Sequence, residues 1–182
     1  MKKRINVGII GRNFGYKVIF KVIQKIKSFN TTALCFKKNS NLNTYKHIKI
    51  YKNWKKILQD KDINAVIIAS PPNTHFNIIK EAIKKNIHIF CEKPVTKSYK
   101  EITEICRLIE KRKKISHFVN FEFPKIAAFK FLKKNILNKI KIKKIIVDWS
   151  IKIPKQKRSS WKIFIPKVGV SFLIIFVIPC II

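Results

Sequence analysis

The chain has few arginines and no helix-turn-helix or aromatic-basic motif. Only five of its 41 basic residues are arginine, the residue that base-edge recognition favours. The net charge of +32 is spread as single lysines through every segment, among many Ile and Asn residues, so we interpret it as the bias of an A+T-rich coding sequence. The sequence therefore predicts no specific nucleic-acid partner. Non-specific adhesion to polyanions at low salt is expected.

Paired cysteines and a cleavable leader are also missing. Cys35, Cys91, Cys106 and Cys180 form no C-x-x-C pair and have no spacing with histidines that is typical of zinc. We predict reduced thiols in a cytoplasmic protein, and no metal. Residues 1–11 carry positive charges before an apolar run, but the run is short, broken by glycines and lacks a small-residue cleavage site, so it predicts a strand.

Residues 65–94 are the most informative stretch that is present. The apolar run 65–69 predicts a buried parallel strand, which Ser70-Pro71-Pro72-Asn73 ends. A helix follows with Phe76, Ile79, Ala82 and Ile83 on one face, and residues 87–91 predict the next strand, followed by Glu92-Lys93-Pro94. Because ligands bind outside the carboxyl ends of parallel strands, segments 70–75 and 92–94 are expected to face one cavity.

The first 36 residues predict a second strand–turn–helix unit. Residues 5–10 form the strand, and a helix follows whose apolar face is Val18, Ile19, Val22, Ile23 and Ile26. The turn between them resembles a dinucleotide-binding loop, in which glycines allow a tight turn and close approach to a pyrophosphate. Gly11 and Gly15 suit this role, whereas Asn13 and Tyr16 occupy the second and third glycine positions. The alternative is a plain strand–helix turn. The predicted cofactor-binding residues of the turn are Gly11, Arg12, Asn13, Phe14 and Gly15.

Four motifs, in order, carry a family resemblance. VGIIGRNFG, AVIIASPPNTH, IHIFCEKPVTKS and VNFEFP resemble the Gfo/Idh/MocA family of NAD(P)-dependent oxidoreductases, over residues 4–162. The CEKP tetrapeptide is the most specific of them. The resemblance implies a Rossmann-type doubly wound parallel sheet of the α/β class, followed by an incomplete α/β second domain. It also implies hydride transfer to or from a hydroxyl or carbonyl of a sugar, cyclitol or related small molecule.

The resemblance also implies roles for individual residues. Lys93 would lie beside the nicotinamide and the substrate, where its amine polarises or hydrogen-bonds the reacting oxygen. Glu92 would contact the nicotinamide ribose. The loop around the nicotinamide half of the cofactor would be lined by Ser70, Pro71, Asn73 and His75. Two plainer interpretations stay open, namely that Lys93 is a solvated lysine and that His75 is a helix-entry residue without a ligand.

The residues after the second predicted strand bear on the choice of cofactor. Residues 31–36 form that strand, and Lys37 and Lys38 follow it with no carboxylate nearby. An acidic residue at this place binds the ribose 2′-hydroxyl of NAD, whereas cations suit a 2′-phosphate. The sequence therefore favours NADP, with Lys37 as a cofactor-binding residue.

Residues 98–182 are expected to complete the first domain and to begin a second one. Ser98-Tyr99-Lys100-Glu101 is a capping box that opens a helix, and residues 115–119 predict a strand. The family pattern would place a domain boundary close to Asn120, followed by a helix with Phe129, Leu132 and Ile136 and by a strand over 140–150. We predict a Rossmann domain over 1–119, the start of a substrate domain over 120–162 and an aberrant hydrophobic tail over 163–182.

The tail departs from the family pattern. Val168-Gly169-Val170 replaces a glycine-rich turn, and no His or Asp follows residue 148, which motivates the hypothesis of a frameshift or an early stop. Residues 169–182 are too few to span a bilayer, which takes about 20, so we expect no membrane span but an aggregation hazard. Activity and a homo-oligomer are expected of a full-length form. The alternative is a non-catalytic dinucleotide-binding remnant.

Overall fold

A computed structural model of the protein describes residues 4–36, 47–112, 114–137 and 139. The chain divides into two units, Met1–Asn138 and Lys139–Ile182, and every described helix and strand lies in the first. Lys37, Lys38, the predicted strand over 140–150 and the tail lie outside the described residues. The domain boundaries at 119 and 162 stay predictions.

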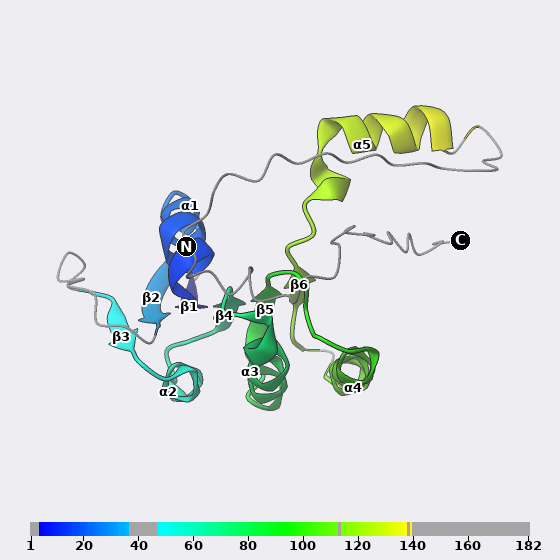
Figure 1. Ribbon diagram of the computed structural model, residues 1–182. Helices are drawn as coiled ribbons and strands as arrows, with labels where there is room; N and C mark the ends of the chain where they lie inside the picture. Colours follow the sequence, from blue (N-terminus) through cyan, green and yellow to red (C-terminus); the bar gives the residue numbers. More distant parts are fainter. Residues whose placement is uncertain (1–3, 37–46, 113, 138, 140–182) are drawn as a thin grey trace, which may run out of the picture. The chain divides into compact units, whose positions relative to one another are not determined.

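Six parallel strands form one sheet in the order β3-β2-β1-β4-β5-β6 (Figure 1). This is the strand order of doubly wound dinucleotide-binding folds, so the predicted fold class is confirmed. The strands are β1 (Ile5–Ile10), β2 (Phe29–Cys35), β3 (Lys49–Tyr51), β4 (Ala65–Ile68), β5 (His88–Cys91) and β6 (His117–Val119).

Described helices lie between consecutive strands up to β6, except between β2 and β3. They are the π-helix η1 (Arg12–Phe20), α1 (Lys21–Ile23), α2 (Trp54–Gln59), α3 (Pro72–Lys84), α4 (Tyr99–Glu110), the 3₁₀-helix η2 (Phe123–Lys125), α5 (Ala127–Leu132) and the π-helix η3 (Lys133–Leu137). The capping box is confirmed at α4, because the Ser98 hydroxyl accepts from the Glu101 N–H at 3.3 Å. The Glu101 carboxylate in turn accepts from the Lys97 N–H at 3.0 Å, one residue before the cap.

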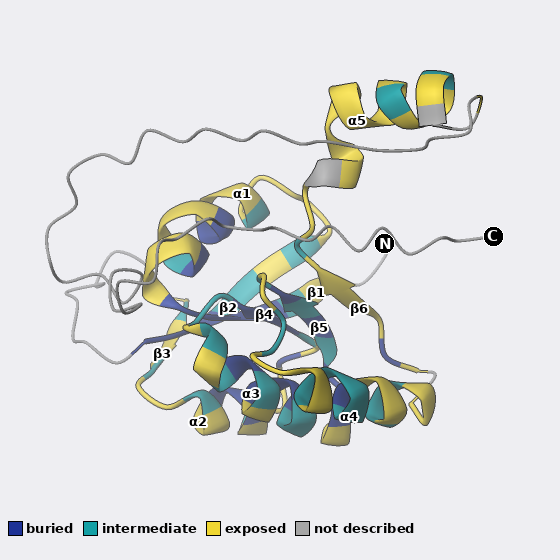
Figure 2. Ribbon diagram, turned by 45° about the vertical axis from the view of Figure 1, so that its right-hand side comes forward, coloured by how far each residue is buried: buried dark blue, intermediate teal, exposed yellow. Residues whose placement is uncertain are grey.

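The two faces of the sheet are covered unequally. Helices α2, α3 and α4 lie on one face, and η1 with α1 lies on the other (Figure 1). The larger cluster of buried side chains lies with α2, α3 and α4, and includes Ile78, Ile79, Ala82 and Ile83 of α3 (Figure 2). Phe76, predicted on the same face, is only partly buried. The core is therefore concentrated on the α3 side.

Two parts of the fold differ from the sequence prediction. The β3–α2 segment was not predicted, because three residues of strand and six of helix are too short for a clear hydrophobic period. The apolar face predicted for the first helix is only partly packed. Ile19 is buried, but Val18 and Val22 are 43% and 53% exposed. They border a groove that the described residues leave open.

Candidate active site

The predicted site segments come together at one edge of the sheet. Because all six strands run parallel, the residues that follow β1, β4, β5 and β6 lie at the carboxyl edge. These are the Gly11 turn, the Ser70 loop, Glu92-Lys93-Pro94 and Asn120. Strands β1 and β4 are neighbours, so the chain order reverses between them, and such a reversal is where ligands bind in open α/β sheets.

Gly11 brings the turn after β1 against the end of β4. Its φ of 132° lies in a region that side chains rarely adopt, and a Cβ there would stand 2.2 Å from the Ala69 carbonyl oxygen. The Gly11 N–H donates to the Cys35 carbonyl at 3.0 Å, and the Ala69 N–H donates to the Ile10 carbonyl at 2.8 Å. Only glycine fits this position, so the loops after β1, β2 and β4 are held together at one point.

The rest of the turn opens a helix at the same edge. The Tyr16 N–H donates to the Gly11 carbonyl at 3.1 Å, so the N–H groups of residues 12–15 form the start of η1, the end of a helix that attracts anions. Arg12, Asn13 and Phe14 are exposed there. Tyr16, at the third glycine position, instead stacks on Phe20 with ring centroids 5.5 Å apart. A glycine-tight turn with exposed amides suits a pyrophosphate.

The loop after β4 is ordered by two side chains of α3. The Ser70 and Thr74 hydroxyls share a hydrogen bond of 2.6 Å, and the Thr74 hydroxyl donates to the Pro71 carbonyl at 2.8 Å. His75 is 1% exposed, with Nε2 2.8 Å from the Ser70 carbonyl and Nδ1 2.9 Å from the Pro94 carbonyl. Pro71 and Asn73 are exposed. His75 is thus directed at protein carbonyls from two loops.

Glu92 and Lys93 follow β5 in different surroundings. Glu92 is half-buried, and its carboxylate accepts from the Asn120 side-chain amide. Lys93 is exposed, its Nζ lies 3.9 Å from the Glu122 carboxylate, and the peptide bond to Pro94 is cis. Asn120 therefore hydrogen-bonds the Glu92 carboxylate, and Glu122 lies near the Lys93 ammonium.

Cys91 precedes this motif and is a protonated thiol. Burial, and then the neighbouring Glu92 carboxylate, raises the pKa of the Cys91 thiol to about 12. The Cys91 Sγ lies 3.5 Å from Nδ1 of His75, and the thiol donates to the Glu92 carbonyl at 3.2 Å. Since a thiolate is the reactive form, Cys91 is a structural residue and not a nucleophile.

Sequence reasoning missed three residues that shape this edge, namely Thr74, Asn120 and Glu122. Thr74 could have been found as a hydroxyl one turn after Ser70 at a helix start. Asn120 and Glu122 follow β6, which pairs with β5 in parallel, so they too lie at the carboxyl edge of the sheet.

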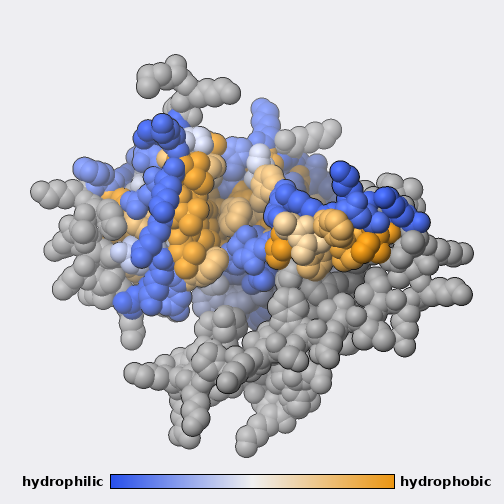
Figure 3. All heavy atoms as spheres, turned by 90° about the horizontal axis from the view of Figure 1, so that it is seen from above, coloured by the Kyte–Doolittle hydropathy of each residue, from blue (hydrophilic) through white to orange (hydrophobic). Residues whose placement is uncertain are grey.

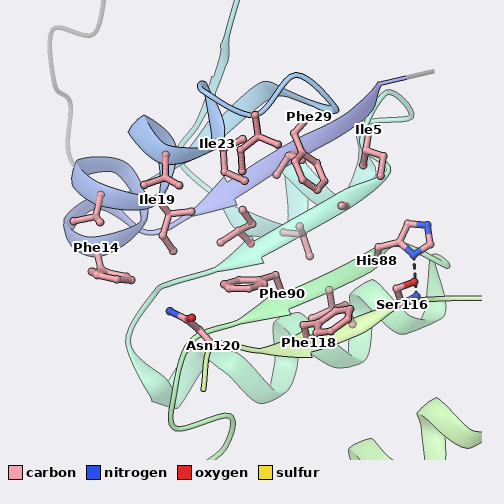
Figure 4. Close-up of a pocket in the computed structure, with 18 residues that line it drawn as sticks. Ile5, Phe14, Ile19, Ile23, Phe29, His88, Phe90, Ser116, Phe118 and Asn120 are labelled. Carbon is pink, nitrogen blue, oxygen red and sulfur yellow. Dashed lines mark hydrogen bonds between the residues drawn. The ribbon is translucent and has the colours of Figure 1, made fainter. Parts of the chain in front are cut away.

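One cavity extends from these loops along the sheet. It is a groove of about 560 Å³ along the sheet face that η1 and α1 only partly cover (Figure 4). Phe14 and Asn120 lie at one end, His88 and Ser116 lie at the other, and Phe118 is 67% exposed between them. The view onto this side of the molecule shows a band of hydrophobic surface (Figure 3). The groove is apolar, unlike the carboxyl edge.

Comparison with solved structures identifies the fold. The solved structure of apo scyllo-inositol dehydrogenase from Lactobacillus casei is similar, with a TM-score of 0.67, 22% identity and coverage of 73% of this chain and 41% of that one. The structure of that enzyme with bound NAD(H) and scyllo-inositol has a TM-score of 0.66 and 22% identity, over 72% of this chain and 40% of that one. At this identity the likeness shows the fold, a Rossmann-type parallel sheet flanked by helices.

Sequence comparison then gives the family. Residues 5–121 match the model GFO_IDH_MocA, described as an oxidoreductase family with an NAD-binding Rossmann fold, so the chain belongs to this family. An uncharacterized oxidoreductase of Synechocystis sp. is 28% identical over 86% of this chain and 44% of its own length. The myo-inositol 2-dehydrogenase of Thermotoga maritima is 32% identical over 50% of this chain and 27% of its own length. The chain thus spans less than half the length of these relatives. No helix in the described segments is both long and apolar enough to cross a bilayer.

Proposed function

We propose that this protein is an NAD(P)-dependent oxidoreductase that transfers hydride to or from a hydroxyl or carbonyl of a sugar, cyclitol or related small molecule. One observation carries the proposal: the Gly11 turn, the Ser70 loop and Lys93 follow strands whose carboxyl ends share one edge. The substrate class is supported by relatives that are named as myo-inositol 2-dehydrogenase and levoglucosan dehydrogenase. The free thiols of Cys35, Cys91 and Cys106 fit a cytoplasmic location.

The residues at this edge fit a dinucleotide. Gly11 leaves no room for a Cβ, and the turn that it forms would hold a pyrophosphate on the amides of residues 12–15. Glu92, held by Asn120, would accept a hydrogen bond from the nicotinamide ribose. Ser70, Pro71 and Asn73 would line the same half of the site. When bound, the nicotinamide supplies or accepts the hydride.

Lys93 is the proposed catalytic residue. Its ammonium is half-exposed and lies 3.9 Å from the Glu122 carboxylate. A charged ammonium donates a hydrogen bond to the substrate oxygen and stabilises the negative charge that develops there during hydride transfer. The alternative, a binding protein without turnover, is kept because the described residues supply one candidate catalytic group.

We further propose a preference for NADP, which rests on the two lysines after the second strand. Lys37 and Lys38 would attract a 2′-phosphate, so the Lys37→Glu/Lys38→Glu variant should weaken NADPH binding by about tenfold or more and leave NADH binding within about twofold. Fluorescence titration with both reduced cofactors measures this. Tighter binding of NADH by the wild type would contradict the preference.

Replacement of Lys93 tests the proposed function. Lys93→Ala should lower kcat on a panel of sugars and cyclitols by at least about a hundredfold, because the developing charge loses its hydrogen-bond donor, while the dissociation constant of NADH or NADPH changes by less than about threefold. Lys97→Ala, an exposed lysine four residues further on, is the matched control and should keep full activity. Turnover that survives in Lys93→Ala would contradict the role. Cofactor binding by the wild type without turnover on the panel would favour the alternative.

A further inference from the structure

His75 is the one polar residue among the buried side chains of the described segments. Its ring lies between two loops that are 24 residues apart in the sequence, near the Ser70 carbonyl after β4 and the Pro94 carbonyl after β5. Both distances, 2.8 and 2.9 Å, are those of good hydrogen bonds. A carbonyl oxygen can only accept, so the neutral ring donates to one of the two carbonyls and the imidazolium donates to both.

We propose that His75 is a positioning residue that fixes the Ser70 loop and the Glu92-Lys93-Pro94 loop relative to each other, because its ring places one nitrogen at hydrogen-bond distance from a backbone carbonyl of each loop. This inference rests on the proposed function. It differs from a direct cofactor contact, because the ring is 1% exposed and both nitrogens are directed at protein carbonyls. It also differs from mere core packing, because a hydrocarbon side chain of the same size would leave the carbonyl that the ring bonds without its donor.

The contact with Pro94 links the ring to Lys93. Pro94 follows Lys93 directly, so the carbonyl that the ring holds lies one residue from the proposed catalytic ammonium. On the other side, the Ser70 carbonyl belongs to the residue whose hydroxyl bonds to Thr74, the residue before His75. Thr74 and His75, at the start of α3, therefore both contact Ser70. Through its other ring nitrogen, His75 also contacts Pro94.

Two conservative variants separate the two bonds. The amide nitrogen of Gln reaches about as far as Nε2 of histidine, and that of Asn about as far as Nδ1. His75→Gln should therefore keep a donor near the Ser70 carbonyl and lose the contact with the Pro94 carbonyl, whereas His75→Asn should do the reverse. His88→Gln is the matched control, because His88 lies at the opposite end of β5, where its Nδ1 accepts from the Ser116 N–H (Figure 4).

Hydrogen exchange of the cofactor-free chain is the first measurement. His75→Gln should speed amide exchange of residues 93–97 by about tenfold and leave that of residues 70–74 within about twofold, since one hydrogen bond is worth about a factor of ten. His75→Asn should show the opposite pattern, and His88→Gln should change neither segment. Equal loosening of both segments in both variants would overturn the proposal, because it would mean that the ring only fills space.

Cofactor binding and turnover form the second measurement. His75→Asn should raise the dissociation constant of NADH by about tenfold, and His75→Gln should lower kcat by about tenfold with cofactor binding nearly unchanged. If the wild type binds neither NADH nor NADPH but the exchange pattern holds, the proposed function fails and the positioning role stands. If binding and turnover are found but the exchange pattern is absent, the positioning role fails alone.

A measurement on the wild type keeps the test decisive if the variants do not fold. The chain has four histidines, so ¹⁵N-histidine labelling with His47→Gln, His88→Gln and His117→Gln assigns the His75 ring by elimination. We expect at least one ring N–H of His75 that exchanges slowly with solvent. A ring whose protons all exchange as fast as those of an exposed histidine would overturn the proposal.

Discussion

Gly11 is the residue whose replacement tests the loop geometry most sharply. Gly11→Ala should lower the free energy of unfolding by about 2 kcal/mol or more and weaken NADH binding by at least about tenfold, because its φ of 132° and the 2.2 Å approach to Ala69 leave no place for a methyl group. Urea unfolding and fluorescence titration measure the two effects.

Gly15→Ala is the control for this prediction. A Cβ at Gly15 would stand 3.2 Å from the Ala69 Cβ and from Cγ2 of Ile9, so both side chains need move only slightly. The destabilisation should therefore be clearly smaller than that of Gly11→Ala. Equal effects of the two substitutions would mean that the turn adapts freely and that Gly11 has no special role.

Single residues of the site were predictable from the sequence to different degrees. Gly11 and Lys93 stand out because they lie one and two residues after the end of a strand, and strand ends locate a site in a parallel sheet. The orientation of His75 was not predictable. Its position at the start of a helix is compatible with a ligand contact as well as with a backbone contact, and only the path of the EKP loop decides between them.

At the scale of elements, a small charge network fixes the edge of the sheet. The Asp60 carboxylate, whose side chain is 7% exposed, accepts from the Lys49 ammonium at 3.0 Å and from the Tyr51 hydroxyl at 2.9 Å. Burial alone would raise the pKa of the Asp60 carboxyl, but hydrogen bonds from the Asp62 N–H, Lys49 and Tyr51 lower it below its ordinary value. The network ties β3 to the segment between α2 and β4.

This network predicts a pH-dependent stability. Because the folded pKa of Asp60 lies below the ordinary value of 3.8, its contribution is present above that pH and is lost as the pH falls through the lower folded value. Asp60→Asn should therefore lower the free energy of unfolding by about 1–2 kcal/mol at pH 7, and the difference from the wild type should shrink as the pH falls below about 4. Denaturant unfolding between pH 7 and pH 3 checks this.

Asp62→Asn is the matched control. Its carboxylate also contacts Lys49, at 2.8 Å, but its side chain is 65% exposed, so solvent screens the pair. The substitution should change stability by less than about 0.5 kcal/mol. An Asp62→Asn variant as unstable as Asp60→Asn would contradict the assignment of the network to the buried carboxylate.

Long elements were predicted well and short ones were not. The sequence places α3 and α4 correctly, since each spans at least three turns with a regular apolar face or a clear cap. Strand β3 and helix α2 are too short for a regular apolar pattern, although Asn53 caps α2 by accepting from the Lys55 N–H at 2.9 Å. These two elements depend on tertiary contacts. Strand β3 pairs with the second half of β2, and α2 places Ile57 and Leu58 in the core.

At the scale of the whole molecule, the unequal covering of the sheet has a measurable consequence. The groove beside η1 and α1 exposes Phe118, Val22 and Val18, so the protein should bind the uncharged dye Nile red with a rise in fluorescence. Phe118→Ser should lower that rise. Tyr99→Ser, at an exposed position on α4 outside the groove, should leave it unchanged, and an equal loss in both variants would contradict the assignment.

The doubly wound class of the sheet could be predicted, because strands separated by helices build parallel sheets with helices on both faces. What covers the η1 face does not follow from such a pattern. Periodicity marks Val18, Val22 and Ile26 as one apolar face, but it does not tell which element packs on it.

The central claim is that the Gly11 turn, the Ser70 loop and Glu92-Lys93 bind one dinucleotide. Backbone amide NMR during NADH and NADPH titrations, at a salt concentration that screens the charge of +32, tests it most directly. We predict that the signals of residues 11–15, 70–73 and 92–93 shift together and saturate with one dissociation constant. Shifts scattered over the surface lysines without saturation, or confined to one of the three segments, would contradict the account.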